Sequence, residues 1–145
     1  MLNSKNLNAQ CHCGNVKIDV SRQPDFIQDC NCSLCAKSGG IWGYFEPADV
    51  KVDGRTGSYT RKDYPQPAVE IRFCKFCGST THWILTADHI ARTGQDDKMG
   101  VNMRLFDSAD LDGIELRFPD GKNWFGETEF GFRRKAVILG KNYVL

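Results

Sequence analysis

Hydrophobic and polar residues alternate along several short stretches of this chain. In VKIDV (16–20) the apolar residues alternate with Lys17 and Asp19, and VEIRF (69–73) follows the same rule. Because successive residues of a strand face opposite sides of a sheet, both stretches predict strands with one buried face. The second strand leads directly into Cys74. Aromatic and β-branched runs predict further strands at 41–45, 101–106, 114–118, 129–132 and 136–140.

Helical patterns are few and short. Asp107 is placed to cap one short turn over 107–111, and the polar segment 84–100 holds either a short helix or a loop. The chain shows no alternation of strands with helices, which parallel α/β folds require. Short strands separated by glycine turns therefore predict a mainly β fold with little helix. The length of 145 residues favours a single domain over residues 1–145.

Composition and charge exclude several classes of function. Apolar residues make up 41% and charged residues 26%, as in an ordinary soluble globular protein. The formal net charge of +1 offers no electrostatic footprint for nucleic acid. The first ten residues hold no apolar run, and no stretch approaches the roughly 20 apolar residues that a membrane span needs. We therefore expect a cytoplasmic protein, without a membrane or nucleic-acid partner, whose thiols stay reduced.

The seven cysteines fall into three groups, two of which are pairs. Residues i and i+2 of a strand face the same side, so we predict that Cys11 and Cys13 project together and that His12 points away from them. Cys74 and Cys77, followed by a glycine, have the spacing of a zinc knuckle. Neither pair completes a tetrahedron, but together they supply four thiolates. We predict that Cys11, Cys13, Cys74 and Cys77 hold a closed structural zinc that joins the start of the chain to its middle.

The third group, CNCSLC, contains Cys30, Cys32 and Cys35 and no fourth cysteine. Catalytic zinc sites have three protein ligands and one open position, and thiolates favour zinc or a comparably soft ion. Such a centre is suited to accepting a substrate thiol and activating it as a nucleophile. The alternative is a second structural zinc completed by His82 or His89.

Other interpretations of the cysteines have less support. The odd number of cysteines argues against a disulfide framework. The CKFC pair lacks the βαβ context of a thioredoxin-like redox motif. An iron–sulfur site at CNCSLC lacks its fourth cysteine.

The three cysteine motifs, CHCGNV, CNCSLCAKSG and FCKFCGS in this order, resemble those of the glutathione-dependent formaldehyde-activating enzyme family. VNMRLFD and FPDGKNW also resemble its downstream motifs. The resemblance implies a tent-like arrangement of antiparallel sheets, and it implies the same division of the cysteines into structural and catalytic zinc ligands. The implied activity is that of a carbon–sulfur lyase, S-(hydroxymethyl)glutathione synthase, which joins formaldehyde and glutathione.

Glutathione carries two carboxylates, so its pocket should contain cations. Lys37, which closely follows the third group of cysteines, is the nearest candidate, with Arg92 and Arg104 as alternatives. Trp42 and Tyr44 either line this pocket or belong to the core.

The partner predicted from these features is a small thiol such as glutathione, and the oligomeric state, including a homo-oligomer, is left open. The basic run 133–135 is explained by a solvent-facing strand edge. Two other functions stay open. One is a non-catalytic zinc-binding interaction module. The other, from fold analogy alone, is a methionine sulfoxide reductase, which would need a cysteine free of metal.

Overall fold

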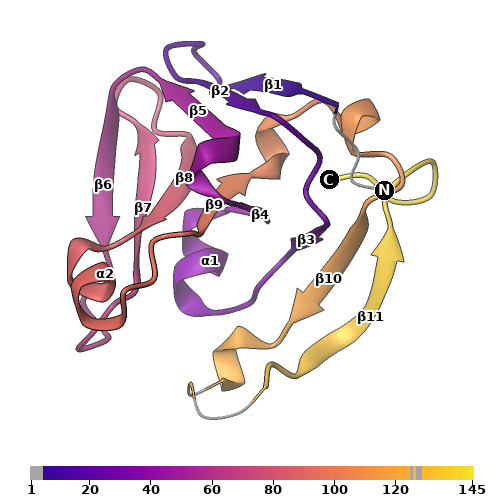
Figure 1. The fold of residues 1–145 in the computed structure, drawn as a ribbon. Coiled ribbons are helices and arrows are strands. Elements are labelled where there is room, and N and C mark those ends of the chain that lie inside the picture. The colour runs from indigo at the N-terminus through magenta and orange to yellow at the C-terminus, as the bar shows by residue number, and fades with distance from the viewer. Residues whose placement is uncertain (1–4, 125, 127–128) are drawn as a thin grey trace.

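The computed structural model describes residues 5–124, 126 and 129–145, and it shows a mainly β protein (Figure 1). A small antiparallel sheet has the strand order β1-β2-β5. Its strands are β1 (Leu7–Gln10), β2 (Lys17–Val20) and β5 (Val50–Asp53). The prediction of a mainly β fold built largely from antiparallel pairs is confirmed.

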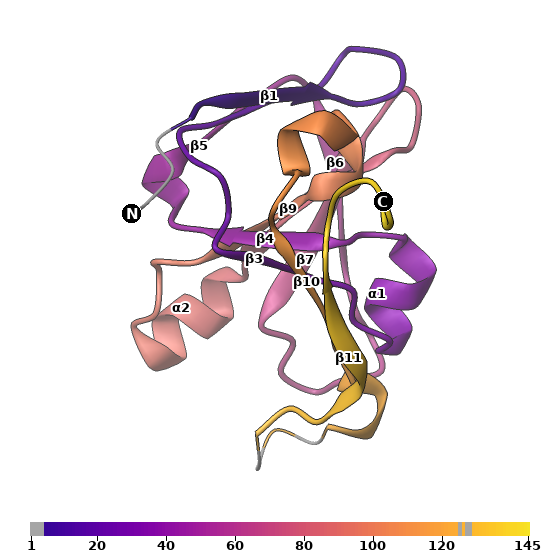
Figure 2. The same ribbon diagram turned by 90° about the vertical axis from the view of Figure 1, so that its right-hand side faces the viewer.

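In the described part of the chain, a larger sheet has the order β11-β10-β3-β4-β9-β8-β7-β6. Its pairs are antiparallel except for β10 with β3, which run parallel. Its strands are β3 (Phe26–Gln28), β4 (Trp42–Phe45), β6 (Thr56–Thr60), β7 (Val69–Cys74), β8 (Thr80–Leu85), β9 (Met99–Asn102), β10 (Glu115–Pro119) and β11 (Phe132–Ile138). The turned view shows the small sheet lying across one end of the larger one (Figure 2).

The helices are short. They are α1 (Ser33–Ser38) and α2 (Ala87–Thr93), with 3-10 turns η1 (Pro47–Asp49), η2 (Met103–Leu105), η3 (Ser108–Leu111) and η4 (Gly121–Asn123). The Asp107 side chain caps η3 by accepting from the Ala109 amide, as predicted. The segment 84–100 does hold a helix, α2. Among the described residues, no helix has the length and apolar character needed to cross a membrane.

Two predicted strands differ from the structure. The expected strand 101–106 ends at Asn102, because the Asn102 side chain accepts from the Arg104 amide and turns the chain into η2. The expected strand 129–132 is wrong, since residues 129–131 are not in a strand and β11 begins at Phe132.

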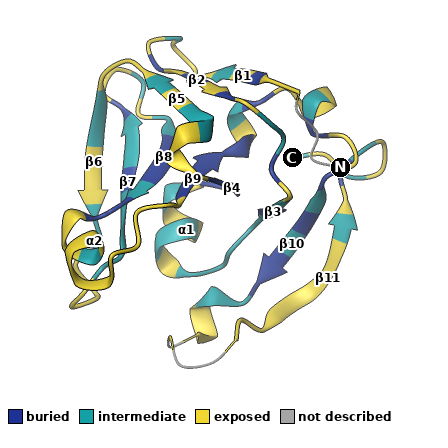
Figure 3. Ribbon diagram, viewed as in Figure 1, coloured by how far each residue is buried: buried dark blue, intermediate teal, exposed yellow. Residues whose placement is uncertain are grey.

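The main core lies between the two sheets. Ile18 from the small sheet and Ile27, Val101 and Leu116 from the large one are fully buried in a single apolar cluster. Burial of each such side chain contributes about 1.5–3 kcal/mol to folding. Strand β11 is mostly exposed, whereas β8 and β9 are mostly buried (Figure 3).

A second apolar cluster positions α1. It contains Trp42, Ile71, Trp83 and Leu85, and Leu34 and Cys35 of α1 pack against it. The helix is therefore fixed to the large sheet through its first turn, which includes Cys35.

Candidate metal centres

The structure brings the two cysteine pairs together into one site. The thiols of Cys11, Cys13, Cys74 and Cys77, called here the four-cysteine site, all lie within 4.8 Å of one another. The Sγ atoms of Cys13 and Cys11 are 3.7 Å apart, and those of Cys13 and Cys74 are 3.6 Å apart. A tetrahedral zinc with sulfur ligands at about 2.3 Å spaces its sulfurs by about 3.8 Å. The donor set and its spacing therefore fit a zinc ion.

Local turns, rather than a strand, position these thiols. Strand β1 ends at Gln10, so the predicted strand geometry for Cys11 and Cys13 is wrong. Both cysteines lie in the turn that follows. A hydrogen bond from the Gly14 amide to the Cys11 carbonyl, 3.0 Å long, closes this turn. At the second pair, Gly78 has φ +77°, which permits its amide to bond to the Cys74 carbonyl at 2.9 Å.

Hydrogen bonds stabilise two of these sulfurs as thiolates. The Asn15 amide nitrogen donates to Cys13 Sγ at 3.1 Å and lowers the pKa of Cys13. The Ser79 hydroxyl lies 3.2 Å from Cys77 Sγ and is the largest cause that lowers the pKa of Cys77, to about 5. Thiolates are the form that binds metal, so these contacts favour the ligand state.

The remaining cysteines form a separate cluster, called here the three-cysteine site. The thiols of Cys30, Cys32 and Cys35 lie within 4.8 Å of one another. Cys30 follows the end of β3, while Cys32 is the N-cap residue of α1 and Cys35 lies within that helix. Among the described residues, no histidine or carboxylate joins the cluster.

Each sulfur of the three-cysteine site accepts a hydrogen bond from an N–H group. The Cys32 amide donates to Cys30 Sγ at 3.4 Å, and the Cys35 amide donates to Cys32 Sγ at 3.4 Å. The indole N–H of Trp42 donates to Cys35 Sγ at 3.3 Å. Such N–H donors orient ligand sulfurs and tune their donor strength. Trp42 therefore belongs to the core and contacts the site as well.

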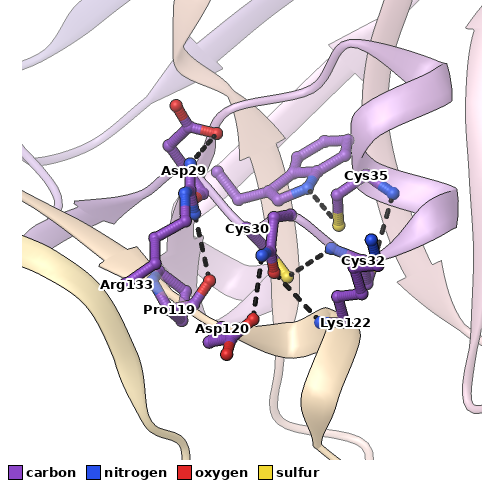
Figure 4. A network of polar contacts seen from close by, with 10 residues as sticks. Asp29, Cys30, Cys32, Cys35, Pro119, Asp120, Lys122 and Arg133 are labelled. Carbon is purple, nitrogen blue, oxygen red and sulfur yellow. Dashed lines mark hydrogen bonds and ion pairs between the residues drawn. The ribbon is translucent and has the colours of Figure 1, made fainter.

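The loop after β10 lies directly against the three-cysteine site (Figure 4). Asn31, between two of the cysteines, donates to Asp120 at 2.8 Å and accepts from the Lys122 amide at 3.0 Å. A Cβ on Gly121 would lie 2.4 Å from Cys30 Sγ, so only glycine fits there without displacement. The loop therefore fixes the Cys30–Cys32 segment that leads into α1.

Arg133 supports the same segment. This side chain of β11 donates to the backbone carbonyls of Asp29 and Pro119 and forms an ion pair with the Asp29 carboxylate at 3.3 Å (Figure 4). The prediction of a solvent-facing edge for the run 133–135 is confirmed, because β11 is an edge strand and all three residues are exposed; Arg133 contacts the cysteine-bearing segment in addition. Its role depends on strand pairing between distant segments, so the sequence gives no signal for it.

The three thiols of this site differ in pKa. Hydrogen bonds from Cys30 and then Cys35 lower the pKa of Cys32, and the positive charge of Arg61 acts in the same direction. Contacts with the Cys30 and then the Cys32 thiol, together with burial, raise the pKa of Cys35. Cys32 is therefore the first of the three to ionise, and a divalent cation would displace protons from its neighbours.

A pocket of about 600 Å³ borders α1 beside the three-cysteine site. Lys37, the candidate cation named from the sequence, lines it together with Arg61 and Lys62 from the segment after β6. Arg61 and Lys62 were missed, because a polar turn between strands has the sequence of an ordinary solvated loop.

Several other predicted residues lie elsewhere. Arg92 of α2 pairs with Asp88 at 2.9 Å, and Arg104 is exposed in η2; neither lines the pocket. Tyr44 does not line it either, and its hydroxyl donates to Gln28 at 2.9 Å. Burial, with a smaller effect of the nearby thiols, raises the pKa of Tyr44.

Neither histidine suggested as a fourth ligand belongs to the three-cysteine cluster. His82 is buried in β8 with Nδ1 2.9 Å from the Thr81 hydroxyl. His89 lies in α2 with Nε2 3.0 Å from the Gln95 side chain. The alternative of a second site completed by either side chain is therefore not supported.

The fold and the two clusters define a mainly β protein built around two candidate metal sites. A match to the family described as glutathione-dependent formaldehyde-activating enzyme covers residues 6–115, a span that contains all seven cysteines. The chain belongs to this family. It is also similar to a crystal structure of a Rhodobacter sphaeroides protein, with a TM-score of 0.55 and 25% identity over 74% of this chain and 97% of that one.

Proposed function

We propose that the protein is a zinc-dependent carbon–sulfur lyase of the S-(hydroxymethyl)glutathione synthase type. It would add the thiol of glutathione to formaldehyde or a related small carbonyl compound. Cys11, Cys13, Cys74 and Cys77 would hold a structural zinc, and Cys30, Cys32 and Cys35 would hold the catalytic one. Family membership supports this class of reaction.

The observation that carries the proposal is the number of ligands at the three-cysteine site. Its thiols converge within 4.8 Å, and the described residues offer no fourth cysteine, histidine or carboxylate to the cluster. Catalytic zinc sites have this composition, whereas structural sites are closed by four protein ligands. The four-cysteine site of the same chain provides that contrast.

A zinc ion bound at the three cysteines would supply Lewis acidity that keeps an incoming thiol ionised near neutral pH. The chain's own groups prepare the site for this ion. The Cys32, Cys35 and Trp42 N–H groups each donate to a ligand sulfur, at 3.3–3.4 Å. Asn31 and Gly121 hold the ligand loop in place, as described above.

The reaction is an addition that needs no oxidant. The thiolate sulfur forms a bond to the carbonyl carbon, the carbon–oxygen π bond breaks, and the oxygen takes up a proton. Since the product retains every atom of both reactants, the protein's contribution is to ionise the thiol and to hold it near the carbonyl compound.

The test is an exchange measurement, because thiols and formaldehyde also combine without a catalyst. Two-dimensional exchange NMR with ¹³C-formaldehyde and glutathione measures the interconversion rate with and without protein. We expect the wild type to accelerate exchange above the uncatalysed rate and Cys32→Ser to give no acceleration. Equal rates with wild type, variant and buffer would overturn the proposal and favour a non-catalytic zinc module.

A further inference from the structure

The pocket beside α1 shares its wall with the three-cysteine site. Two of its residues, Ser33 and Leu34, lie between Cys32 and Cys35 in the sequence, so one helical turn supplies both ligands and pocket wall. Lys37 lies one further half-turn along the same helix. The pocket is lined by Ser33, Leu34, Lys37, Ser38, Tyr59, Arg61, Lys62 and Asp63.

Among the described residues, no carboxylate pairs with the two lysines of this pocket. Arg61 pairs with Asp63 through two hydrogen bonds, at 2.8 and 2.9 Å, and therefore neutralises the pocket's single carboxylate. Lys37 and Lys62 form no ion pair with any carboxylate in the described part of the chain. Two ammonium groups thus face the pocket without an internal counter-charge, which favours an anionic ligand.

One side chain, that of Arg61, connects the wall opposite α1 to the helix. The Arg61 guanidinium also donates to the Ser33 hydroxyl at 3.3 Å and lies 5.5 Å from the Tyr64 ring centroid. Arg61 therefore links the segment after β6, to which it belongs, with Ser33 of α1. Leu34 and Tyr59 add apolar surface between the charged groups.

We propose that this pocket binds the carboxylates of the thiol substrate and selects anionic thiols over neutral ones. The inference rests on the proposed function for the identity of the ligand. Several bonds separate the carboxylates of glutathione from its sulfur, so a thiol held at the three cysteines would extend them along the wall of α1 that carries Lys37. The lysines are specificity residues, since they contact the part of the substrate that does not react.

The test separates the pocket from the metal by using S-methylglutathione, which keeps both carboxylates but has no free thiol. Isothermal titration calorimetry at low salt compares the binding of glutathione, S-methylglutathione and glutathione diethyl ester to the metal-loaded protein. We expect the double variant Lys37→Gln/Lys62→Gln to weaken binding of both acids roughly tenfold and to leave the ester unchanged. The control is Lys51→Gln/Lys141→Gln, which removes two exposed lysines outside the pocket.

Equal affinity of the wild type for glutathione and its diethyl ester would overturn the inference, as would equal effects of the two double variants. Failure of the proposed function gives a different pattern. In that case S-methylglutathione still binds in a lysine-dependent way, while the formaldehyde exchange rate stays at the uncatalysed value, and the pocket assignment stands. Catalysed exchange that is insensitive to both lysines and to esterification contradicts the pocket alone.

Discussion

Trp42 connects the second apolar cluster to the three-cysteine site through its hydrogen bond to Cys35. Trp42 is 1% exposed, so its indole N–H has no solvent partner and Cys35 Sγ is its acceptor at 3.3 Å. A buried donor that loses its acceptor, or a ligand that loses its donor, costs free energy. The residue therefore couples the packing of the second apolar cluster to the ligand properties of the site.

Replacing this donor should weaken metal binding at one site only. Trp42→Phe removes the N–H and keeps most of the apolar volume, so we expect a roughly tenfold lower Co²⁺ affinity at the three-cysteine site, with a shifted sulfur-to-cobalt absorption band. Competition with a chromophoric chelator measures the affinity. Trp83→Phe, in the same cluster but without a hydrogen bond to a cysteine sulfur among the described residues, is the control. The role assigned to Trp42 is contradicted if both variants shift the band equally.

Gly121 offers a second test at the scale of one residue. The Cβ of Gly121→Ala would lie 2.4 Å from Cys30 Sγ, so the loop or the ligand must move. We expect this variant to lose the metal of the three-cysteine site while it retains the other ion and its far-ultraviolet circular dichroism. Gly131→Ala, where a Cβ meets nothing within 4 Å, should keep both ions. Full metal content in Gly121→Ala would contradict the packing described.

Between elements, the pairing of β7 and β8 buries a histidine that titrates abnormally. The Thr81 hydroxyl donates its proton to the Arg72 carbonyl at 3.2 Å. His82 Nδ1 lies 2.9 Å from the Thr81 hydroxyl oxygen and therefore carries a proton, which it donates to that oxygen. Burial, and then the charge of Arg72, lower the pKa of His82 to about 4. The neutral ring is therefore the form that the fold accommodates.

Acid should destabilise the fold through this residue. The unfolded chain binds a proton at His82 near its ordinary pKa of about 6.5, and the folded chain binds it only near pH 4, so stability falls as pH falls through that window. From about pH 7 to about pH 5 the expected loss in the free energy of unfolding is about 2 kcal/mol. Denaturant titrations of wild type and His82→Gln measure it, since metal loss affects both alike. The two proteins should lose equal stability if the ring is not buried and neutral.

At the scale of the elements, alternation in the sequence predicts β2, whose two buried residues share one face. It also predicts β7, although that strand buries Ile71 and Cys74 on opposite faces. It does not predict α1, a helix of six residues whose N-cap is Cys32 rather than a conventional capping residue. It also overextends β9, because one side-chain bond from Asn102 ends that strand. Short elements of this kind depend on single hydrogen bonds and ligand geometry, which periodicity does not encode.

For the whole molecule, the four-cysteine site joins the turn after β1 to the turn after β7, which belong to different sheets. The grouping of the cysteines could be predicted from their spacing in the sequence, because the ligands of one metal ion have to lie close together. The pocket could not, because Arg61 and Lys62 approach α1 only once β6 takes the edge of the large sheet.

Loss of one ligand at this junction should therefore unfold the protein. A structural zinc with thiolate ligands contributes on the order of 10 kcal/mol, comparable with the whole stability of a domain. We expect Cys13→Ser to lose its cooperative thermal transition and its chemical-shift dispersion in NMR. A variant that melts cooperatively near the wild-type temperature would show that the four-cysteine site does not hold the sheets together.

The central claim is that the three-cysteine site binds its own metal ion, separately from the ion that holds the fold together. Elemental analysis of zinc per chain in purified wild type and Cys32→Ser tests it most directly, with circular dichroism to confirm folding. The account predicts about two ions per chain in the wild type and about one in a folded Cys32→Ser variant. The same zinc content in both proteins would contradict it.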